Sequence, residues 1–258
     1  MNNFVCLTVN SVELCLTQGD ITLQETDAIV NAANSGLMGG GGVDGAIHRA
    51  GGPVILAECK QIVARQGPLP PGQAVITTGG NLKVKHVIHT VGPVWYGGAR
   101  NEPGVLASAY RESLKLAANK GLSSVSFPSI STGAYGYPVD AAAKVAIGTV
   151  YSYLNANTTS LKEVVFVLFG ATAFRAYTTA LEEFRDKQDK GCPSANCESG
   201  LSLFPRCRNA GNTGKHHLSP LLRQTHGLLS GTSIVLATTP EHLQPKFSRS
   251  FVSDPLNV

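Results

Sequence analysis

Charged side chains are scarce in this chain, since Lys, Arg, Asp and Glu make up only 15% of its 258 residues. They are also nearly balanced in the first part: residues 1–187 contain 14 Lys and Arg against 13 Asp and Glu, and residues 188–258 contain 7 against 4. A domain that binds nucleic acid through its phosphates normally has a strong basic excess. We therefore expect no nucleic-acid partner.

Long hydrophobic runs are lacking too. No apolar stretch approaches the ~18 to 20 residues needed to cross a bilayer, and residues 1–10 have neither the basic nor the long apolar region of a signal peptide. We expect no membrane partner and a cytoplasmic location. The hydrophobic content of 43% is sufficient for one sizeable core.

Cysteine is infrequent, with six residues in the chain. Cys6, Cys15 and Cys59 fall in predicted strands or helices, where buried structural thiols are expected, and no disulfide is expected in a cytoplasmic protein. None lies beside a candidate base, so they are not expected to be nucleophiles. The remaining cysteines lie near two histidines, and a zinc module is the alternative for this group: Cys192, Cys197, Cys207, His216 and His217. Its spacing fits zinc poorly because a second close pair is missing.

Apolar periodicity predicts alternating strands and helices. The expected strands are residues 4–9, 12–17, 28–31, 74–77, 87–89, 124–128 and 163–168, and the expected helices are residues 53–65, 102–119, 139–154 and 171–185. Such alternation is typical of an α/β fold with helices on both faces of a mostly parallel sheet. Beyond the helices the composition shifts to Ser, Pro, Gly and Asn without periodicity. We therefore predict a domain over residues 1–187 and a disordered C-terminal extension over 188–258.

A glycine-rich segment follows the third predicted strand, with the sequence NAANSGLMGGGGVDGAIH at residues 31–48. Glycines let backbone N–H groups close on an anion, and the start of the next helix favours negative charge. Asp44 would repel a phosphate that it only contacted, so its expected task is to orient a hydroxyl or a water beside the anion. The alternative is that the glycines form a plain turn and Asp44 caps the helix.

These residues resemble the signature of macro domains, specifically the macroD-type branch that hydrolyses ADP-ribose esters. Further matching segments occur in family order: GDIT at 19–22, GQAVIT at 72–77, HVIHTVGPVW at 86–95 and SISTGAYGYP at 129–138. The resemblance covers about residues 4–185, and the joint order of short motifs is far more specific than any one of them. It implies a three-layer α-β-α domain with a mostly parallel mixed central sheet and an irregular C-terminal tail.

The resemblance also implies a role for particular residues. Asp20 would accept a hydrogen bond from the adenine amino group and Ile21 would contribute its backbone, although Asp20 in a simple turn is an equally good interpretation from sequence alone. Phe169 would lie near adenine, but Gly170 stands where many relatives have an acidic residue. The remaining expected contacts are with the phosphates and the distal ribose: Asn34, Gly42, Val43, Asp44, Ser131, Thr132, Gly133, Ala134 and Tyr135.

The implied activity is hydrolysis of an ester on the distal ribose of ADP-ribose, in O-acetyl-ADP-ribose or in ADP-ribosylated protein Asp or Glu, with Asp44 and Asn34 as catalytic residues. These residues require no metal, and no cofactor is expected. ADP-ribose derivatives, and ADP-ribosylated proteins, are the expected partners. The alternative is a module that binds ADP-ribose without turnover, which would need the phosphate loops but not the pair Asn34 and Asp44.

Overall fold

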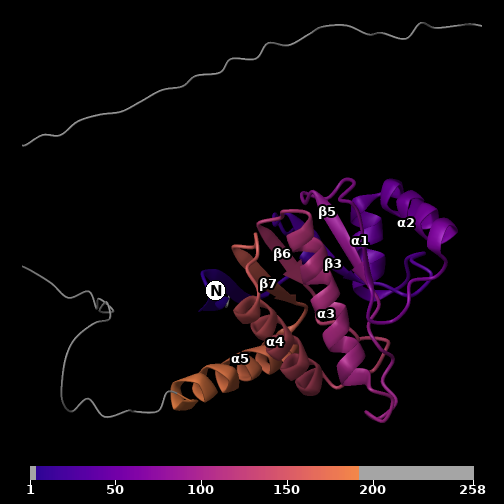
Figure 1. Ribbon diagram of the computed structural model, residues 1–258. Coiled ribbons are helices and arrows are strands. Elements are labelled where there is room, and N and C mark those ends of the chain that lie inside the picture. Colours follow the sequence, from indigo (N-terminus) through magenta and orange to yellow (C-terminus); the bar gives the residue numbers. More distant parts are fainter. Residues whose placement is uncertain (1–3, 192–258) are drawn as a thin grey trace, which may run out of the picture. The chain divides into compact units, whose positions relative to one another are not determined.

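The computed structural model describes residues 4–191 (Figure 1). Its strands are β1 (Phe4–Val9), β2 (Val12–Gln18), β3 (Ala28–Ala32), β4 (Ala74–Thr78), β5 (His86–Thr90), β6 (Ser124–Phe127) and β7 (Glu163–Leu168). Its helices are α1 (Gly42–Gly51), α2 (Pro53–Gln66), α3 (Glu102–Asn119), α4 (Val139–Ala156) and α5 (Ala171–Gly191), with a 3-10 turn at Ile21–Leu23. The alternation expected from the sequence is therefore confirmed, with bounds that differ by a few residues.

The seven strands form one mixed sheet in the order β1-β2-β7-β6-β3-β5-β4. All neighbours from β2 to β5 pair in parallel, whereas β1 and β4 pair antiparallel at the two edges. Parallel strands end at the same edge of a sheet. The segments that follow β3, β5 and β6 therefore emerge side by side, and this edge carries the candidate site.

Helices cover both faces of the sheet and enclose two cores. On β3, Val30 packs into the core under α3, α4 and α5, whereas its neighbour Ile29 packs into the core under α1 and α2, because successive strand side chains point to opposite faces. Figure 1 shows the two groups of helices on opposite sides of the sheet. The predicted three-layer arrangement is confirmed.

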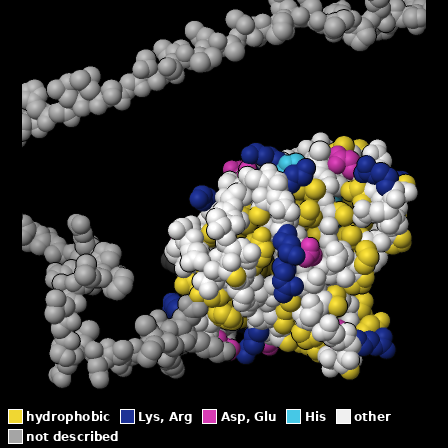
Figure 2. Space-filling view, in the orientation of Figure 1, with side chains coloured by type: hydrophobic (Ala, Val, Ile, Leu, Met, Phe, Trp, Pro, Cys, Tyr) yellow, Lys and Arg dark blue, Asp and Glu magenta, His cyan; other side chains and the backbone are white. Residues whose placement is uncertain are grey.

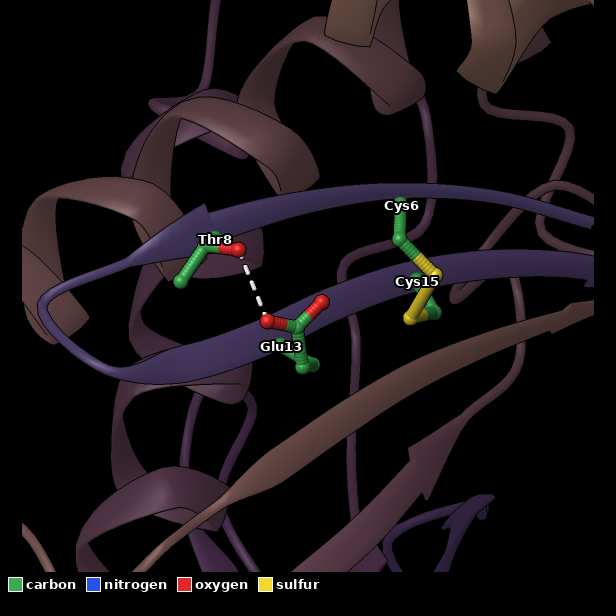
Figure 3. The surroundings of a disulfide bond; sticks show 4 residues. All are labelled: Cys6, Thr8, Glu13 and Cys15. Atoms are coloured by element: carbon green, nitrogen blue, oxygen red, sulfur yellow. Dashed lines mark hydrogen bonds between the residues drawn. A yellow bond between two sulfur atoms is a disulfide. The ribbon is translucent and has the colours of Figure 1, made fainter. Parts of the chain in front are cut away.

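The β1–β2 hairpin corrects one expectation, because Cys6 and Cys15 form a disulfide (Figure 3). A two-residue turn at Asn10 and Ser11, both with positive φ, sets a register in which the two cysteines lie directly opposite each other. The expectation of unpaired thiols rested on the presumed compartment and ignored this register. Cys59 is free and buried, as expected.

Surface charge is dispersed on the face formed by α3 and α4. Figure 2 shows Lys and Arg side chains scattered among uncharged groups on this face, with Asp and Glu between them. Within residues 4–191, no helix is long and apolar enough to span a membrane.

The predicted domain boundary at residue 187 falls inside α5 and stays a prediction. The proposed extension and its candidate zinc ligands lie outside the described residues, apart from the first residues after 187, which belong to α5.

Candidate active site

A cavity of about 260 Å³ lies at the carboxyl ends of the parallel strands. It is formed by the loop between β3 and α1, the loop between β6 and α4, and one glycine after β5. Its lining residues are Ala32, Ala33, Asn34, Gly40, Gly41, Gly42, Val43, Asp44, Gly92, Ser129, Ile130, Ser131, Gly133, Ala134 and Tyr135. The two glycine-containing motifs of the sequence thus meet around one space.

The first loop turns sharply into α1. Gly42 has φ of 58°, a left-handed conformation that favours glycine. The helix begins there with Gly41 as its N-cap, and no side chain caps its first N–H groups. Uncapped N–H groups at a helix start, together with the helix dipole, favour an anion. This end of the cavity is suited to a phosphate.

The second loop is closed by its own backbone. The N–H of Tyr137 donates to Ser131 O at 3.0 Å, and that of Gly136 donates to Gly133 O at 2.9 Å. Ser131 has φ of 65° and its buried hydroxyl has no hydrogen-bond partner among the described residues. A strained backbone and an unpartnered buried hydroxyl are both costly, and such features cluster at binding sites.

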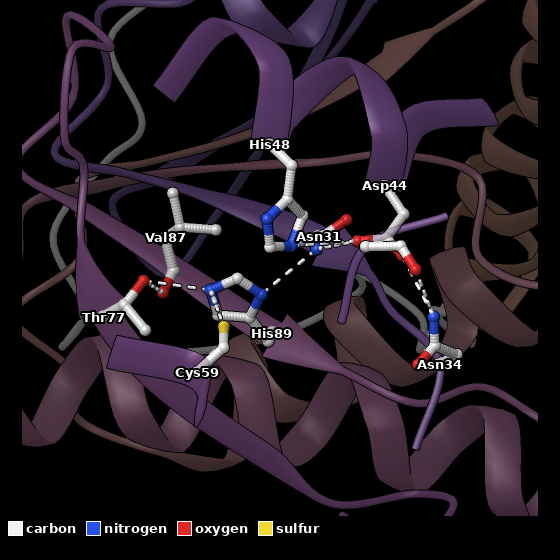
Figure 4. Close-up of polar contacts among 9 residues, drawn as sticks. Asn31, Asn34, Asp44, His48, Cys59, Thr77, Val87 and His89 are labelled. Carbon is white, nitrogen blue, oxygen red and sulfur yellow. Dashed lines mark hydrogen bonds and ion pairs between the residues drawn. The ribbon is translucent and has the colours of Figure 1, made fainter. Parts of the chain in front are cut away.

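Asp44 lies in the first turn of α1 and is 4% exposed. The amide of Asn31 donates to its Oδ1 at 2.7 Å, and the amide of Asn34 lies 3.4 Å from its Oδ2 while donating to Gly39 O at 2.8 Å (Figure 4). The carboxylate therefore binds side chains of the strand and loop, not the backbone of its own helix. The capping alternative for Asp44 is not what the structure shows.

Burial governs the protonation of this carboxyl. Desolvation raises the pKa of Asp44, while the hydrogen bond from Asn31 and the nearby His48 partly oppose the shift. His48 Nε2 lies 3.4 Å from Asp44 Oδ1, close enough for attraction if the ring is protonated, but this nitrogen has no aligned hydrogen-bond partner. The contact between His48 and Asp44 is therefore electrostatic, and it does not determine the orientation of the carboxylate. A raised pKa makes Asp44 a stronger base than an exposed aspartate.

Most residues predicted from the sequence meet in this cavity, while four of them lie elsewhere. Thr132 bonds back to Ser129, its Oγ1 donating to the Ser129 carbonyl at 3.1 Å. Asp20 caps the 3-10 turn by accepting from Thr22 N at 2.9 Å, with Ile21 buried behind it. Phe169 follows β7 and is 89% exposed. The adenine contacts expected of Asp20, Ile21 and Phe169 stay predictions.

Asn31 is the functional residue that the sequence analysis did not single out. It is fully buried, and it makes the shortest hydrogen bond to Asp44. The signal was present, because Asn31 is a polar side chain within an apolar strand, directly before the glycine loop. Buried polar side chains are normally hydrogen-bonded, so Asn31 required a partner.

Two groups of side chains have the proximity of metal ligands within residues 4–191: His48, Cys59 and His89, and Cys6, Glu13 and Cys15. In the first group both nitrogens of His89 already have hydrogen-bond partners, Asn31 and Thr77. In the second group both sulfurs form the disulfide. Neither donor set is free to bind an ion.

A larger concavity of about 650 Å³ lies over α3 and α4 and includes Arg111, Lys115, Lys144 and Phe184. It has no glycine loop, and Lys115 and Lys144 are paired with Glu112 and Glu183. We assign the chemistry to the smaller cavity because it alone of the two combines a buried carboxylate with an anion-binding helix start.

The fold and this cavity define an α/β protein with a glycine-lined anion pocket beside one buried carboxylate. Comparison with known proteins makes the class specific, since residues 30–146 match the Macro domain family. An O-acetyl-ADP-ribose deacetylase of Cronobacter sakazakii is 55% identical over 172 residues, covering 67% of this chain and 95% of that protein. The chain belongs to the macro domain family, as its motifs predicted.

Solved structures of macrodomains are also similar to this chain. The Oceanobacillus iheyensis macrodomain with ADP has a TM-score of 0.69 and 42% identity, covering 72% of this chain and 99% of that one. The Trypanosoma brucei macrodomain in complex with ADP-ribose has a TM-score of 0.60 and 39% identity, covering 65% of this chain and 68% of that one.

Proposed function

We propose that this protein binds ADP-ribose in the glycine-lined cavity and hydrolyses esters on its distal ribose. The start of α1 and the loop at residues 131–135 would hold the diphosphate, leaving the distal ribose beside Asn34 and Asp44. Two similar proteins support the ligand, being described with ADP and with ADP-ribose. The name of the 55% identical relative supports deacetylation of O-acetyl-ADP-ribose.

The polar geometry around Asp44 supports the chemical step. Asp44 Oδ1 is occupied by Asn31, whereas Oδ2 has only the long contact to Asn34 and lies beside Gly40 at the cavity wall. Oδ2 would accept a hydrogen bond from the attacking water, and Asn34 would hold the ribose. The water oxygen bonds to the acyl carbon, the ester bond to the ribose oxygen breaks, and that oxygen takes a proton. The products are ADP-ribose and a carboxylic acid.

The same step would release ADP-ribose from an Asp or Glu side chain of a modified protein, because that linkage is also an ester. Proteins modified in this way are therefore proposed as partners beside the free metabolite.

One observation carries the enzymatic proposal: a buried carboxylate, whose Oδ2 has only the 3.4 Å contact to Asn34, stands at the wall of the glycine-lined cavity. A module that only binds the diphosphate gains nothing from a buried negative charge beside it, because like charges repel.

The test measures turnover and binding together. Acetate release from O-acetyl-ADP-ribose, and ADP-ribose release from a mono-ADP-ribosylated acidic peptide, would be compared between wild type and Asp44→Ala, with ADP-ribose affinity measured by calorimetry. Asp140→Ala is the matched control, because Asp140 also lies in the first turn of a helix, α4, but is exposed and outside the cavity.

We expect Asp44→Ala to lose turnover by a factor of about 100 or more while retaining ADP-ribose binding, and Asp140→Ala to resemble wild type. Tight binding without turnover by the wild-type protein would make it a binding module. Turnover of the acetylated metabolite alone would restrict the proposal to deacetylation.

A further inference from the structure

A row of buried polar side chains lies behind Asp44, on the face of the sheet covered by α1 and α2 (Figure 4). Asn31 on β3 and His89 on β5 are direct register partners, and Thr77 lies on the next strand, β4. Asn31 and His89 are fully buried and Thr77 is 3% exposed. The reaction proposed above uses none of the three.

The three side chains form a continuous chain of hydrogen bonds. Thr77 Oγ1 lies 2.9 Å from His89 Nε2, His89 Nδ1 lies 3.1 Å from the amide nitrogen of Asn31, and that nitrogen lies 2.7 Å from Asp44 Oδ1. Cys59 Sγ is a more distant neighbour of the same His89 nitrogen, at 3.8 Å.

The hydroxyl of Thr77 has one proton and three acceptors within reach. They are the carbonyl oxygens of Thr78 at 3.1 Å and of Val87 at 3.4 Å, and His89 Nε2 at 2.9 Å. The direction of the chain is set at its other end, where the NH₂ group of Asn31 faces both His89 Nδ1 and Asp44 Oδ1. An NH₂ group only donates, so His89 Nδ1 is an acceptor and the proton of the neutral imidazole lies on Nε2. The Thr77 oxygen then accepts from Nε2, and its own proton goes to a backbone carbonyl.

The remaining links follow from the chemistry of imidazole and amide groups. A neutral imidazole with a proton on Nε2 has Nδ1 as an acceptor. Only the NH₂ group of Asn31 can donate to it, and the same NH₂ group then directs its second proton to Asp44 Oδ1. Asp44 Oδ1 is therefore an acceptor and carries no proton of its own, as is true of both oxygens in the ionised form.

We propose that Thr77, His89 and Asn31 are positioning residues that hold Asp44 ionised, with Oδ1 occupied and Oδ2 directed at the cavity. The geometry assigns the Nε2–H tautomer to His89. The catalytic role of these three residues rests on the proposed function, whereas the tautomer of His89 does not depend on that function.

Burial supports a neutral imidazole, since it lowers the pKa of His89 to about 3, with a further contribution from His48. The opposite direction would need a protonated Asp44 donating to the Asn31 oxygen. It would also leave the hydroxyl of Thr77 donating to His89 instead of to two backbone carbonyls. In the observed orientation the amide nitrogen of Asn31 has two acceptors, and its Oδ1 has no hydrogen-bond partner among the described residues.

The other titratable groups facing Asp44 are few. They are His48 on its own helix, at 3.4 Å, and the thiol of Cys59 on α2, whose pKa burial raises to about 12, with Asp44 and Glu58 contributing. Cys59 is therefore a neutral thiol at physiological pH. Because His48 also faces Asp44, the kinetic test needs a comparison variant that leaves His48 in place.

The first test is nuclear magnetic resonance of the whole protein with ¹⁵N-labelled histidine. We expect His89 to show a protonated Nε2 and an unprotonated Nδ1 from mildly acidic to mildly alkaline pH. A protonated Nδ1 in the wild-type protein would overturn the proposal. This result is independent of activity, so it also stands if the protein proves not to be a hydrolase.

The second test is the pH dependence of kcat in Thr77→Val, which removes the hydroxyl at the anchored end. We expect the acid limb to move upward by about one pH unit, that is, about tenfold slower turnover below the wild-type limb, with KM unchanged. Thr77→Ser should restore the wild-type profile.

Thr90→Val is the matched control. Thr90 is another fully buried strand threonine whose hydroxyl donates to a backbone carbonyl, Gln73 O at 2.8 Å, and it does not touch the chain of hydrogen bonds. Its acid limb should stay in place. Identical pH profiles of kcat for Thr77→Val and Thr90→Val would refute the positioning role of Thr77. If Thr77→Val does not fold, the magnetic resonance measurement of the His89 tautomer alone tests the proposal.

Discussion

Replacing Asp44 by Asn should stabilise the fold while abolishing hydrolysis. Asp44 is almost completely buried, and desolvation raises its pKa more than the hydrogen bond from Asn31 and the proximity of His48 lower it. The ionised carboxylate at neutral pH is therefore unfavourable for folding. An asparagine of nearly the same shape can still accept a hydrogen bond from Asn31 without a buried charge.

The sign and size of this effect follow from linkage. Each unit by which folding raises the pKa of a carboxyl removes about 1.4 kcal/mol from the free energy of unfolding at higher pH. Single stabilising substitutions commonly add about 0.5–2 kcal/mol. We expect about 1 kcal/mol for Asp44→Asn at neutral pH, since its new NH₂ group faces the amide of Asn34. A domain of this size would gain about 2–4 °C in Tm.

The assay is thermal unfolding over a pH series, with Asp140→Asn as the exposed first-turn control. The advantage of Asp44→Asn should be full at neutral pH. It should shrink as the pH falls from the raised folded-state pKa toward the unfolded value of about 3.9, below which both states of the wild type are protonated. A lower Tm for Asp44→Asn at neutral pH, or a gain that does not change with pH, would refute the reasoning.

Two further predictions concern residues that support the loops and strands around the cavity. Asp27 accepts from Lys85 and from the hydroxyl and backbone N–H of Ser123, and these contacts lower its pKa. Asp27→Asn should cost about 2 kcal/mol in urea unfolding at neutral pH. The stabilisation from the lowered pKa is complete above about pH 4, the unfolded value, and is lost as the pH falls toward the lowered folded-state pKa. The difference between wild type and Asp27→Asn should therefore narrow in acid, and a constant difference would contradict this reasoning. Gly92→Ala would place a methyl group against Ser131 Oγ and should raise the Kd for ADP-ribose about tenfold, whereas an unchanged Kd would show that the second loop can shift.

The fold was predictable because its signals are local. Apolar runs such as Glu163–Leu168 are long enough to be buried strands, and the intervening helices have the expected apolar spacing. The disulfide shows where this local approach failed. Its two cysteines are symmetric about the turn at Asn10 and Ser11, so pairing was readable from the hairpin register, but composition and presumed location were given more weight.

The candidate site was predictable in its loops and not in its strands. Glycines and the flanking Asn34 and Asp44 form one continuous motif, so their meeting in a cavity follows from the sequence. The contact between Asn31 and His89 depends on which strands are neighbours and on their register. Two strands 58 residues apart become neighbours only through the sheet order, which periodicity does not determine.

This difference between loops and strands corresponds to two properties of the protein, its ligand affinity and its catalytic rate. The loops at 40–42 and 131–135 line the cavity in which we propose that ADP-ribose binds, so changes there should alter affinity and substrate range. In the proposed arrangement the state of the Asp44 carboxylate depends on Asn31, which lies in β3 between the parallel neighbours β6 and β5 and contacts its register partner His89. Changes in those strands should alter kcat and its pH dependence with little effect on binding. The proposed chemistry therefore depends on strand register, because a shift of β3 by a single residue would turn Asn31 to the opposite face of the sheet.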